Sequence, residues 1–222
     1  MNLKTIAIAC STLKEEVMLV AHELQIDYPI LWIQSGLHNT PEKLRKGLQD
    51  QIDHISNVDT ILLVFGVCGN SLYGLKSAHA KIIFPQVDDC ISLFLGGNRQ
   101  KREWDQQGAA YYLTKGYLEM ESNIWTDYQH CLAKYGEEKT RKVMSTMLKG
   151  YKSLRIIETG AYQLPEILDH TRDIAGKLSL EHEVVKGTLD ILYRLFRGQW
   201  DIGFSVIEPG KPVGFSDLGL GG

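Results

Sequence analysis

Short apolar runs alternate with segments of helical spacing over the first 100 residues of this chain. Four runs lack the polar alternation of a half-exposed strand: residues 4–9, 29–34, 59–65 and 81–84. Continuous apolar runs of this length are typical of strands that are covered on both faces. After the first two runs, apolar residues recur at intervals of three and four, which predicts helices over 12–24 and 41–55. Four β-to-α units predict an α/β fold with a doubly wound, mostly parallel sheet and helices on both faces.

Local signals mark where several of these helices begin. Glu15 follows Thr12 at the spacing of a capping box, and Pro41 stands at an expected first helical position. Two shorter helices are predicted over 72–78 and 90–95, the second with an aspartate as its cap. Each start follows the end of a strand, so the residues in between are expected at the carboxyl edge of the sheet.

The hydrophobic pattern is weaker beyond the first 100 residues. Two further strands are predicted over 110–113 and 154–158. Helical spacing over 124–148 predicts a helix that Gly136 interrupts, and the apolar positions of 181–196 predict one amphipathic helix. This half is therefore expected to be more helical than the first.

A chain of 222 residues is long enough to bury a core without disulfides or metal ions. No internal repeat or low-complexity block divides it. We expect a single α/β domain over residues 1–222, with a regular βα half over 1–100, a more helical half over 101–214 and a mobile, glycine-rich tail over 215–222.

Charge and hydropathy narrow the classes of function. The chain has 24 basic and 27 acidic residues, and its net charge of −3 does not give the positive surface that nonspecific nucleic-acid binding needs. No apolar stretch approaches the about 18 uncharged residues of a membrane-spanning helix, and the N-terminus enters a strand without a leader pattern. We therefore expect a cytoplasmic protein with reduced cysteines, whose partners include neither nucleic acid nor membrane. Homo-oligomer formation stays open.

Three cysteines fall where apolar runs end, and they are the most informative residues of the sequence. Cys10 closes the first run, Cys68 follows the third, and Cys90 follows the fourth by a few residues. The carboxyl ends of parallel strands lie along one edge of a sheet, where ligands bind. The sequence therefore predicts that these three thiols converge in one site. Cys131 lies among aromatic and apolar residues of a predicted helix, which predicts core packing.

Converging thiolates are soft ligands that suit iron, zinc or copper better than magnesium or calcium. Three of them could hold three corners of an iron–sulfur cluster and leave one iron open to substrate. Alternatively, they could give a zinc ion three ligands and an open fourth position. A different interpretation treats the cysteines as small buried residues, since free cysteine is among the most buried residue types.

Charged and ionisable residues accompany the cysteines at the predicted edge. Asp88 and Asp89 are candidate catalytic acid or base groups, although either could instead cap the following helix. His38 lies in the loop after the second run and is a further candidate metal ligand. His79 precedes the fourth run, so we place it at the opposite edge and exclude it.

The turn after the third strand is rich in glycine. Gly66, Gly69 and Asn70 are candidate cofactor-binding residues, because glycines permit close approach of the backbone to a cofactor or anion. The turn lacks the spacing of a dinucleotide fingerprint and the ending of a P-loop. If the cysteines are structural, this turn predicts an anion-binding α/β protein.

Several motifs are spread over almost the whole chain: the first strand ending in Cys10, Gly66-Val67-Cys68-Gly69-Asn70, Asp89-Cys90-Ile91, Tyr112-Leu113-Thr114 and Gly198-Gln199-Trp200-Asp201. Together they resemble the DUF1638 family, a group of proteins of anaerobic bacteria and methanogenic archaea. Members of this family often carry a histidine immediately before the Asp-Cys pair, where this chain has Asp88.

The resemblance implies a link to corrinoid-dependent methyl transfer, because such proteins tend to be encoded near methyl-transfer systems. It implies a corrinoid as ligand and a corrinoid protein or methyltransferase as partner. The leading expectation is an enzyme that uses a metal or iron–sulfur site at Cys10, Cys68 and Cys90 on a small-molecule substrate, in anaerobic one-carbon, sulfur or corrinoid metabolism. The alternatives are a noncatalytic corrinoid- or metal-binding accessory protein and an anion-binding protein with structural cysteines.

Overall fold

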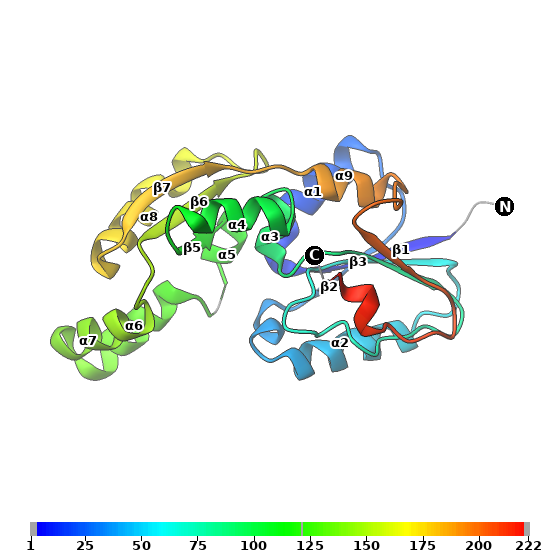
Figure 1. The fold of residues 1–222 in the computed structure, drawn as a ribbon, viewed down its shortest axis with the longest axis horizontal. Coiled ribbons are helices and arrows are strands. Elements are labelled where there is room, and N and C mark those ends of the chain that lie inside the picture. Colours follow the sequence, from blue (N-terminus) through cyan, green and yellow to red (C-terminus); the bar gives the residue numbers. More distant parts are fainter. Residues whose placement is uncertain (1–3, 121, 220–222) are drawn as a thin grey trace.

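The computed structural model describes residues 4–120 and 122–219, without the side chains of His38 and Asn39. Within these residues the strands form two sheets (Figure 1). Sheet A runs in the order β2-β1-β3-β4-β8 and contains β1 (Thr5–Cys10), β2 (Ile30–Ile33), β3 (Thr60–Val64), β4 (Lys81–Pro85) and β8 (Phe204–Ile207). Sheet B runs in the order β5-β6-β7 and contains β5 (Ala110–Leu113), β6 (Ser153–Glu158) and β7 (Glu181–Lys186).

Parallel pairing dominates both sheets. Among the described strands, β8 alone runs antiparallel to its neighbour, β4. The first four strands of sheet A are the four apolar runs of the sequence, and β3 is buried along its whole length between β1 and β4. The predicted α/β class, with mostly parallel sheets and helices packed on them, is confirmed.

Helices cover both faces of sheet A. α1 (Lys14–Glu23) and α9 (Asp190–Phe196) lie on one face, and α2 (Pro41–Asp53) lies on the other (Figure 1). The short α3 (Cys90–Phe94) follows β4 at the carboxyl edge. The described residues also form short 3₁₀ helices: η1 (Ser11–Leu13), η2 (Ser35–Asn39) and η3 (Phe215–Leu218).

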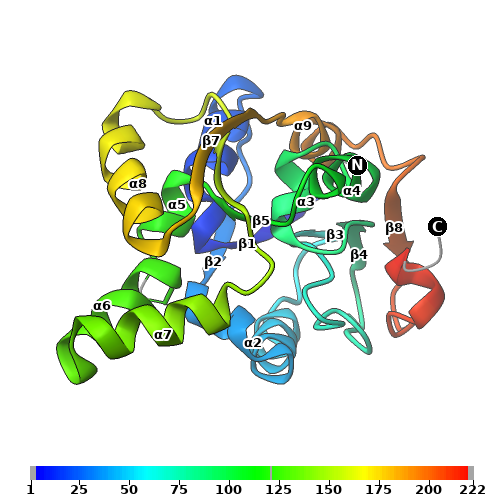
Figure 2. The ribbon, with the colours of Figure 1, turned by 60° about the vertical axis from the view of Figure 1, so that its left-hand side comes forward.

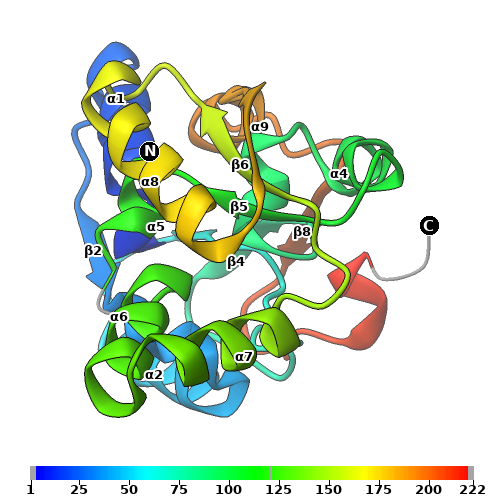
Figure 3. The same cartoon turned by 90° about the vertical axis from the view of Figure 1, so that its left-hand side faces the viewer.

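Sheet B has its own layer of helices. α4 (Asn98–Gln106) and α8 (Pro165–Leu178) lie on opposite sides of it (Figure 3). After β5 come α5 (Lys115–Leu118), α6 (Ile124–Tyr135) and α7 (Glu137–Met147). Gly136 has φ of 76° and separates α6 from α7, so the predicted interruption is confirmed.

The carboxyl ends of the two sheets face each other (Figure 1). α5, which follows β5, packs on η1, which follows β1 (Figure 2). The approach is so close that a Cβ added to Gly116 would lie 2.0 Å from the carbonyl oxygen of Thr12. Beyond β6, the Thr159 hydroxyl donates a hydrogen bond of 3.0 Å to Glu16 in α1. Residues that follow the strands of either sheet therefore meet in the region between the sheets.

Sheet B is inserted into the chain between β4 and β8. The chain leaves sheet A between α3 and α4 and returns between β7 and α9. The two crossings lie side by side, because the amide of Thr188 donates a hydrogen bond of 2.8 Å to the carbonyl of Phe94. The buried side chains form two clusters. The larger one surrounds sheet A and extends to Ala110, Tyr112, Ile157 and Val185 of sheet B, whereas the smaller one lies on sheet B alone; Tyr117 packs against both.

Two predicted helices are wrong. Residues 181–196 are not one helix but β7 followed by α9, because the stretch from Glu181 pairs with β6 along its length. The chain then turns at Gly187, which packs so closely that an added Cβ would lie 2.6 Å from the side chain of Ile157. Residues 72–78 form no helix, because Gly74 and Leu75 use their backbone groups to bond Val213.

The predicted capping box at the start of α1 is also wrong. Thr12 lies inside η1 and is buried, and its hydroxyl donates a hydrogen bond of 3.1 Å to the sulfur of Cys10. α1 begins at Lys14 with Leu13 as its cap residue and without a side-chain capping bond. The Thr12 hydroxyl therefore bonds Cys10 instead of capping α1, and α1 begins later than the sequence pattern indicates.

Part of the tail that we expected to be mobile is packed in η3. Leu218 is buried, and the carbonyl of Asp217 accepts a hydrogen bond from the Ser205 hydroxyl of β8. Residues 220–222 of that expected tail lie outside the described residues.

A buried carboxyl group stands at the contact between the sheets. Glu16 is fully buried; one carboxyl oxygen accepts from Thr159, and the other has no partner among the described residues. Burial raises the pKa of Glu16 to about 7, and the neighbouring charge of Glu15 adds to the rise against the lowering by hydrogen bonds from its own backbone and Thr159. Glu16 is therefore a buried acid that ionises near neutral pH.

We predict that Glu16 makes the stability of the fold depend on pH. The unfolded chain releases this proton near the ordinary value of 4.5 and the folded chain at about 7, so the folded state holds the proton more tightly. The free energy of unfolding should fall as pH rises between these values, by up to about 3 kcal/mol. Urea unfolding at several pH values checks this, and Glu16→Gln should abolish the fall.

Glu15→Gln is the matched control, since Glu15 is the adjacent, half-buried acid. It should keep the pH dependence of the native chain. The same fall in Glu16→Gln as in the native chain would contradict the assignment to Glu16.

Candidate functional site

Three cysteines lie at the carboxyl edge of sheet A. Cys10 is the last residue of β1, Cys90 is the first of α3, and Cys68 lies in the loop after β3. Cys10 and Cys90 are buried, whereas Cys68 is partly exposed. The sulfur atoms of Cys68 and Cys90 are 3.7 Å apart, and both residues are free thiols. The structure thus brings this pair into contact from segments that are far apart in the sequence.

Cys10 lies beside the pair but has a polar partner of its own. Its sulfur accepts the hydrogen bond from the Thr12 hydroxyl. Burial raises the pKa of the Cys10 thiol to about 11, and the neighbouring charge of Cys90 adds to the rise against the lowering by Thr12. Among the residues that the structure describes, no three His, Cys, Asp or Glu side chains are grouped closely enough to hold one metal ion.

Cys90 is the most deeply enclosed member of the pair. The amide of Gly66 donates to its sulfur at 3.5 Å. The hydrogen bond with Cys68 raises the pKa of Cys90 well above its usual range, and burial adds to this. A helix N-terminus normally lowers a cysteine pKa. Here that effect is outweighed, so Cys90 is a protonated thiol at neutral pH.

The loop after β3 is held against the segment that precedes α3. Gly66 lies so close to it that an added Cβ would be 2.3 Å from the carbonyl carbon of Asp89. The amides of Val67 and Cys68 donate to the carbonyls of Val87 and Asp88 at 2.8 and 2.9 Å. These contacts aim the side chain of Cys68 at the start of α3.

Cys68 adopts a conformation that few side chains favour. Its φ is 46°, and Gly69 and Asn70 follow at 68° and 66°. A left-handed backbone costs a residue with a Cβ roughly 1–2 kcal/mol. Such strain is found where the surrounding structure imposes it, often at functional sites. Gly69 adopts its positive φ without this strain because it has no Cβ, and it lies close to the ring of Pro41. The cofactor role of Gly66, Gly69 and Asn70 stays a prediction.

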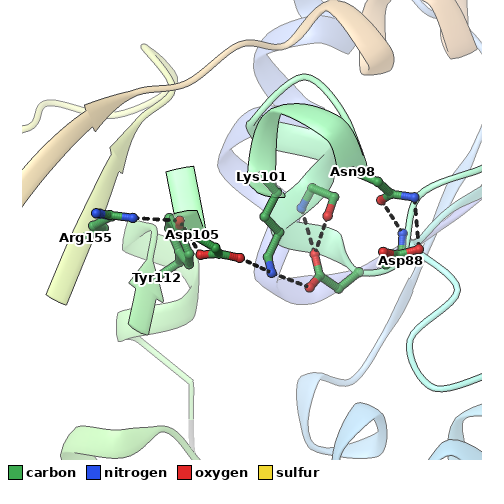
Figure 4. Close-up of polar contacts among 8 residues, drawn as sticks. Asp88, Asn98, Lys101, Asp105, Tyr112 and Arg155 are labelled. Carbon is green, nitrogen blue, oxygen red and sulfur yellow. Dashed lines mark hydrogen bonds and ion pairs between the residues drawn. The ribbon is translucent and has the colours of Figure 1, made fainter. Parts of the chain in front are cut away.

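The two aspartates before Cys90 have structural partners. Asp89 caps α3, because one carboxylate oxygen accepts from both the amide and the hydroxyl of Ser92 at 2.8 Å. The predicted cap is confirmed. Asp88 is fixed by Asn98 through two hydrogen bonds (Figure 4). The backbone amide of Asp88 donates to the Asn98 side-chain oxygen at 2.7 Å, and the Asn98 side-chain NH₂ group donates to the Asp88 carboxylate at 2.9 Å. The acid or base role of Asp88 and Asp89 stays a prediction.

A chain of polar contacts runs from sheet B to the cap of α3 (Figure 4). Arg155 donates to the Tyr112 hydroxyl at 3.1 Å, and this hydroxyl donates to Asp105 at 2.9 Å. Lys101 lies between Asp105 and Asp89, at 3.2 and 3.7 Å. The apolar pattern of the sequence does not reveal this chain of contacts, because α4 buries no residue fully and so has no apolar stripe. The spacing of four between Lys101 and Asp105 is the signal that could have revealed it.

Tyr117 of α5 closes the site from the side of sheet B. Burial raises the pKa of its hydroxyl well above the usual range, and the charges of Cys90, Cys68 and Cys10 add to this in that order. Tyr117 is therefore a neutral phenol within electrostatic range of all three sulfur atoms. It lies in the aromatic segment after the strand predicted over 110–113, for which the sequence favoured packing.

The remaining candidates lie elsewhere. The side chain of His38 lies outside the described residues, so its role as a ligand stays a prediction. His79 is exposed and precedes β4, at the amino edge where the sequence places it. Cys131 packs against the core of sheet B, as predicted.

Fold and site together define an α/β protein with a thiol cluster between the facing edges of a mostly parallel sheet and a parallel sheet. The chain belongs to the DUF1638 family, described as "Protein of unknown function (DUF1638)", whose family model matches residues 32–196. The resemblance seen in the sequence is thus confirmed. The match contains Cys68 and Cys90, and Cys10 lies before it.

Other comparisons add little to this assignment. No curated protein matches the chain. A solved structure described as "Crystal structure of a small-chain dehydrogenase" is 14% identical, with 82% of this chain and 95% of that chain covered, at a TM-score of 0.21. A score this low carries no argument about fold or function. No helix in the described part of the chain is both long enough and apolar enough to cross a bilayer.

We predict that Gly66→Ala disrupts the site by overpacking. The added methyl group would meet the main chain of Asp89, which cannot turn aside as a flexible side chain can. The free energy of unfolding should fall by about 1 to 3 kcal/mol, and the thiols of Cys68 and Cys90 should become more reactive. Gly36→Ala is the control, because nothing lies within 4 Å of a Cβ there. Equal stability of both variants would contradict the close approach at Gly66.

The left-handed conformation of Cys68 predicts an unusual order of stability. Cys68→Gly should be more stable than Cys68→Ala by about 0.5 to 1 kcal/mol, because glycine alone escapes the strain of a positive φ. Cys131 provides the matched comparison inside α6. There the free energy of unfolding of Cys131→Ala should exceed that of Cys131→Gly by about 1 kcal/mol. Denaturant unfolding of the four variants measures both orders. The same order at both positions would contradict the strain at Cys68.

Proposed function

We propose that Cys68, Cys90 and Cys10 bind one soft metal ion, such as Zn²⁺, and that the protein is a metal-dependent enzyme for a small-molecule substrate. The ion would lie at the carboxyl edge of sheet A, facing sheet B. In α/β proteins with parallel sheets, this edge is where ligands bind.

The distance between two sulfur atoms carries the proposal. A tetrahedral zinc ion with Zn–S bonds of about 2.3 Å holds two thiolates about 3.8 Å apart. The sulfur atoms of Cys68 and Cys90 are 3.7 Å apart, so this pair suits a shared ion with little movement. In a four-iron cluster each cysteine binds a different iron, which requires wider spacing. The pair therefore favours a single ion over the cluster that the sequence also suggested.

The third ligand requires a local rearrangement. Among the described residues no three His, Cys, Asp or Glu side chains are grouped closely enough to hold one ion, so Cys10 would have to give up the hydrogen bond from Thr12 and move toward the pair. Thiols must lose their protons to bind a metal. Burial raises the pKa of Cys10, and the hydrogen bond with Cys68 together with burial raises the pKa of Cys90, so binding should release protons and strengthen as pH rises.

Residues around the cysteines support the chemistry of such a site. An ion with three protein ligands would supply a Lewis acid with a fourth position for substrate. The phenol of Tyr117 keeps its proton at neutral pH and places a neutral polar group within electrostatic range of the thiols. The cap formed by Asp89 fixes the start of α3, and Lys101 places a positive charge next to that cap.

The corrinoid ligand, the methyltransferase or corrinoid-protein partner and the role in one-carbon or sulfur metabolism rest on the family resemblance. They stay predictions, as does homo-oligomer formation. A noncatalytic accessory protein would bind the ion or a corrinoid without turning over a substrate, which distinguishes it from the enzyme.

Metal titration tests the proposal. Reduced, metal-free protein prepared without oxygen should bind one Zn²⁺ per chain in competition with a chromogenic chelator. Cys68→Ala and Cys90→Ala should each weaken binding by more than the about 10- to 100-fold that loss of an outer-shell partner costs. With Co²⁺ in place of Zn²⁺, the spectrum should show thiolate charge transfer and the visible bands of a tetrahedral ion.

Cys131→Ala is the matched control, because Cys131 packs in the core of sheet B away from the site. It should bind zinc like the native chain. Absence of binding in the native chain, or equal binding after loss of Cys68 or Cys90, would contradict the proposal.

A further inference from the structure

We propose that Cys68 and Cys90 also form a redox-active dithiol, which a small-molecule disulfide converts into an intramolecular disulfide. This reaction uses two of the sulfur atoms that we assign to the metal site, but it requires no metal ion. It adds a second chemistry to the site, and it can be tested separately.

The pair is already close to bonding distance. A disulfide has an S–S bond of about 2.05 Å, and the free sulfurs are 3.7 Å apart. The main chains that carry them are held together by the bond from the Cys68 amide to the carbonyl of Asp88. Closure therefore requires side-chain rotation within a backbone arrangement that is already in place.

The two thiols differ in exposure, and this gives them different roles in the reaction. Cys68 is partly exposed, so a small disulfide can reach it. Cys90 is 4% exposed and accepts a hydrogen bond from the amide of Gly66. It can therefore react with the sulfur of Cys68 but not directly with a disulfide in solution. A reachable thiol backed by an enclosed one is the arrangement in which the second thiol resolves a mixed disulfide.

The other cysteines are less suited to this reaction. Cys10 is buried, and its sulfur is engaged by the hydroxyl of Thr12. Cys131 is partly exposed, but it lies in α6 and packs against the smaller buried cluster, whereas Cys68 and Cys90 belong with the larger one. The contact between Cys68 and Cys90 thus selects one pair out of four free thiols in the sequence.

The steps balance as two thiol–disulfide exchanges. The thiolate of Cys68 attacks one sulfur of a disulfide RSSR, which breaks the S–S bond and releases RS⁻. Cys90 then passes its proton to the released RS⁻, and its sulfur attacks the sulfur of Cys68, forms the intramolecular bond and releases the second RS⁻. The two cysteines lose two electrons, RSSR gains them, and the two protons of the cysteine thiols end on the two RSH products.

Closure has a consequence for metal binding. The disulfide lacks the two thiolates that we assign to the ion, so the oxidised chain should lose its affinity for zinc. This consequence rests on the proposed function, whereas closure itself does not.

Peptide mapping tests the proposal on the metal-free native chain. The protein is equilibrated with oxidised dithiothreitol, a cyclic small-molecule disulfide, and its remaining thiols are alkylated in denaturant. We expect two alkylated cysteines in place of four, an intact mass lower by about 2 Da before alkylation, and a linked peptide pair that carries Cys68 and Cys90. Cys131→Ser should form the same link, and Cys68→Ser should form none.

A link from Cys90 to Cys10, or four alkylated cysteines at every ratio of disulfide to dithiol, would overturn the proposal. Zinc titration of the same reduced sample separates it from the proposed function. Zinc binding without closure would refute the dithiol and leave the metal site standing. Closure without zinc binding would support the dithiol and refute the metal site.

Discussion

The thiol pair depends on a backbone contact between the loop after β3 and the segment before α3. Gly66 has no side chain, so its main chain lies against that of Asp89. The amide of Cys68 donates a hydrogen bond to the carbonyl of the residue before Asp89, which is Asp88. These contacts bring Cys68 to Cys90 across 22 positions of sequence. The sulfur spacing and the raised pKa of Cys90 both follow from this approach, which no larger residue than glycine permits at position 66.

Sequence pattern predicted the first half of the fold well, because its strands are buried on both faces and therefore read as plain apolar runs. It failed where a pattern had two meanings. The apolar positions of 181–196 fit a helix, but pairing with β6 makes the first part an edge strand. The division of the strands into two sheets depends on which strands pair, and apolar spacing along one chain does not carry that information.

The candidate site was predictable as far as strand order determines it. The ends of β1, β3 and β4 bring Cys10, Cys68 and Cys90 to one edge, as sequence position indicated. For Cys90, the hydrogen bond with Cys68 and burial together outweigh the lowering of the pKa expected from a helix N-terminus. Tyr117 could not be assigned from sequence, because it reaches the thiols through the meeting of two sheets that no local pattern records.

The adjacent crossings between the sheets affect how the molecule can move. Phe94 and Thr188, one in each crossing, are joined by a backbone hydrogen bond, so bending of the chain at these two segments would rotate sheet B relative to sheet A. Such a rotation would part Gly116 from Thr12 and leave the Cys68–Cys90 pair intact, because both cysteines belong to the sheet A side. This rotation would change access to the sulfur atoms without separating them, but it would have to break the packing of Ile157 and Val185 of sheet B in the buried cluster that also holds Cys90.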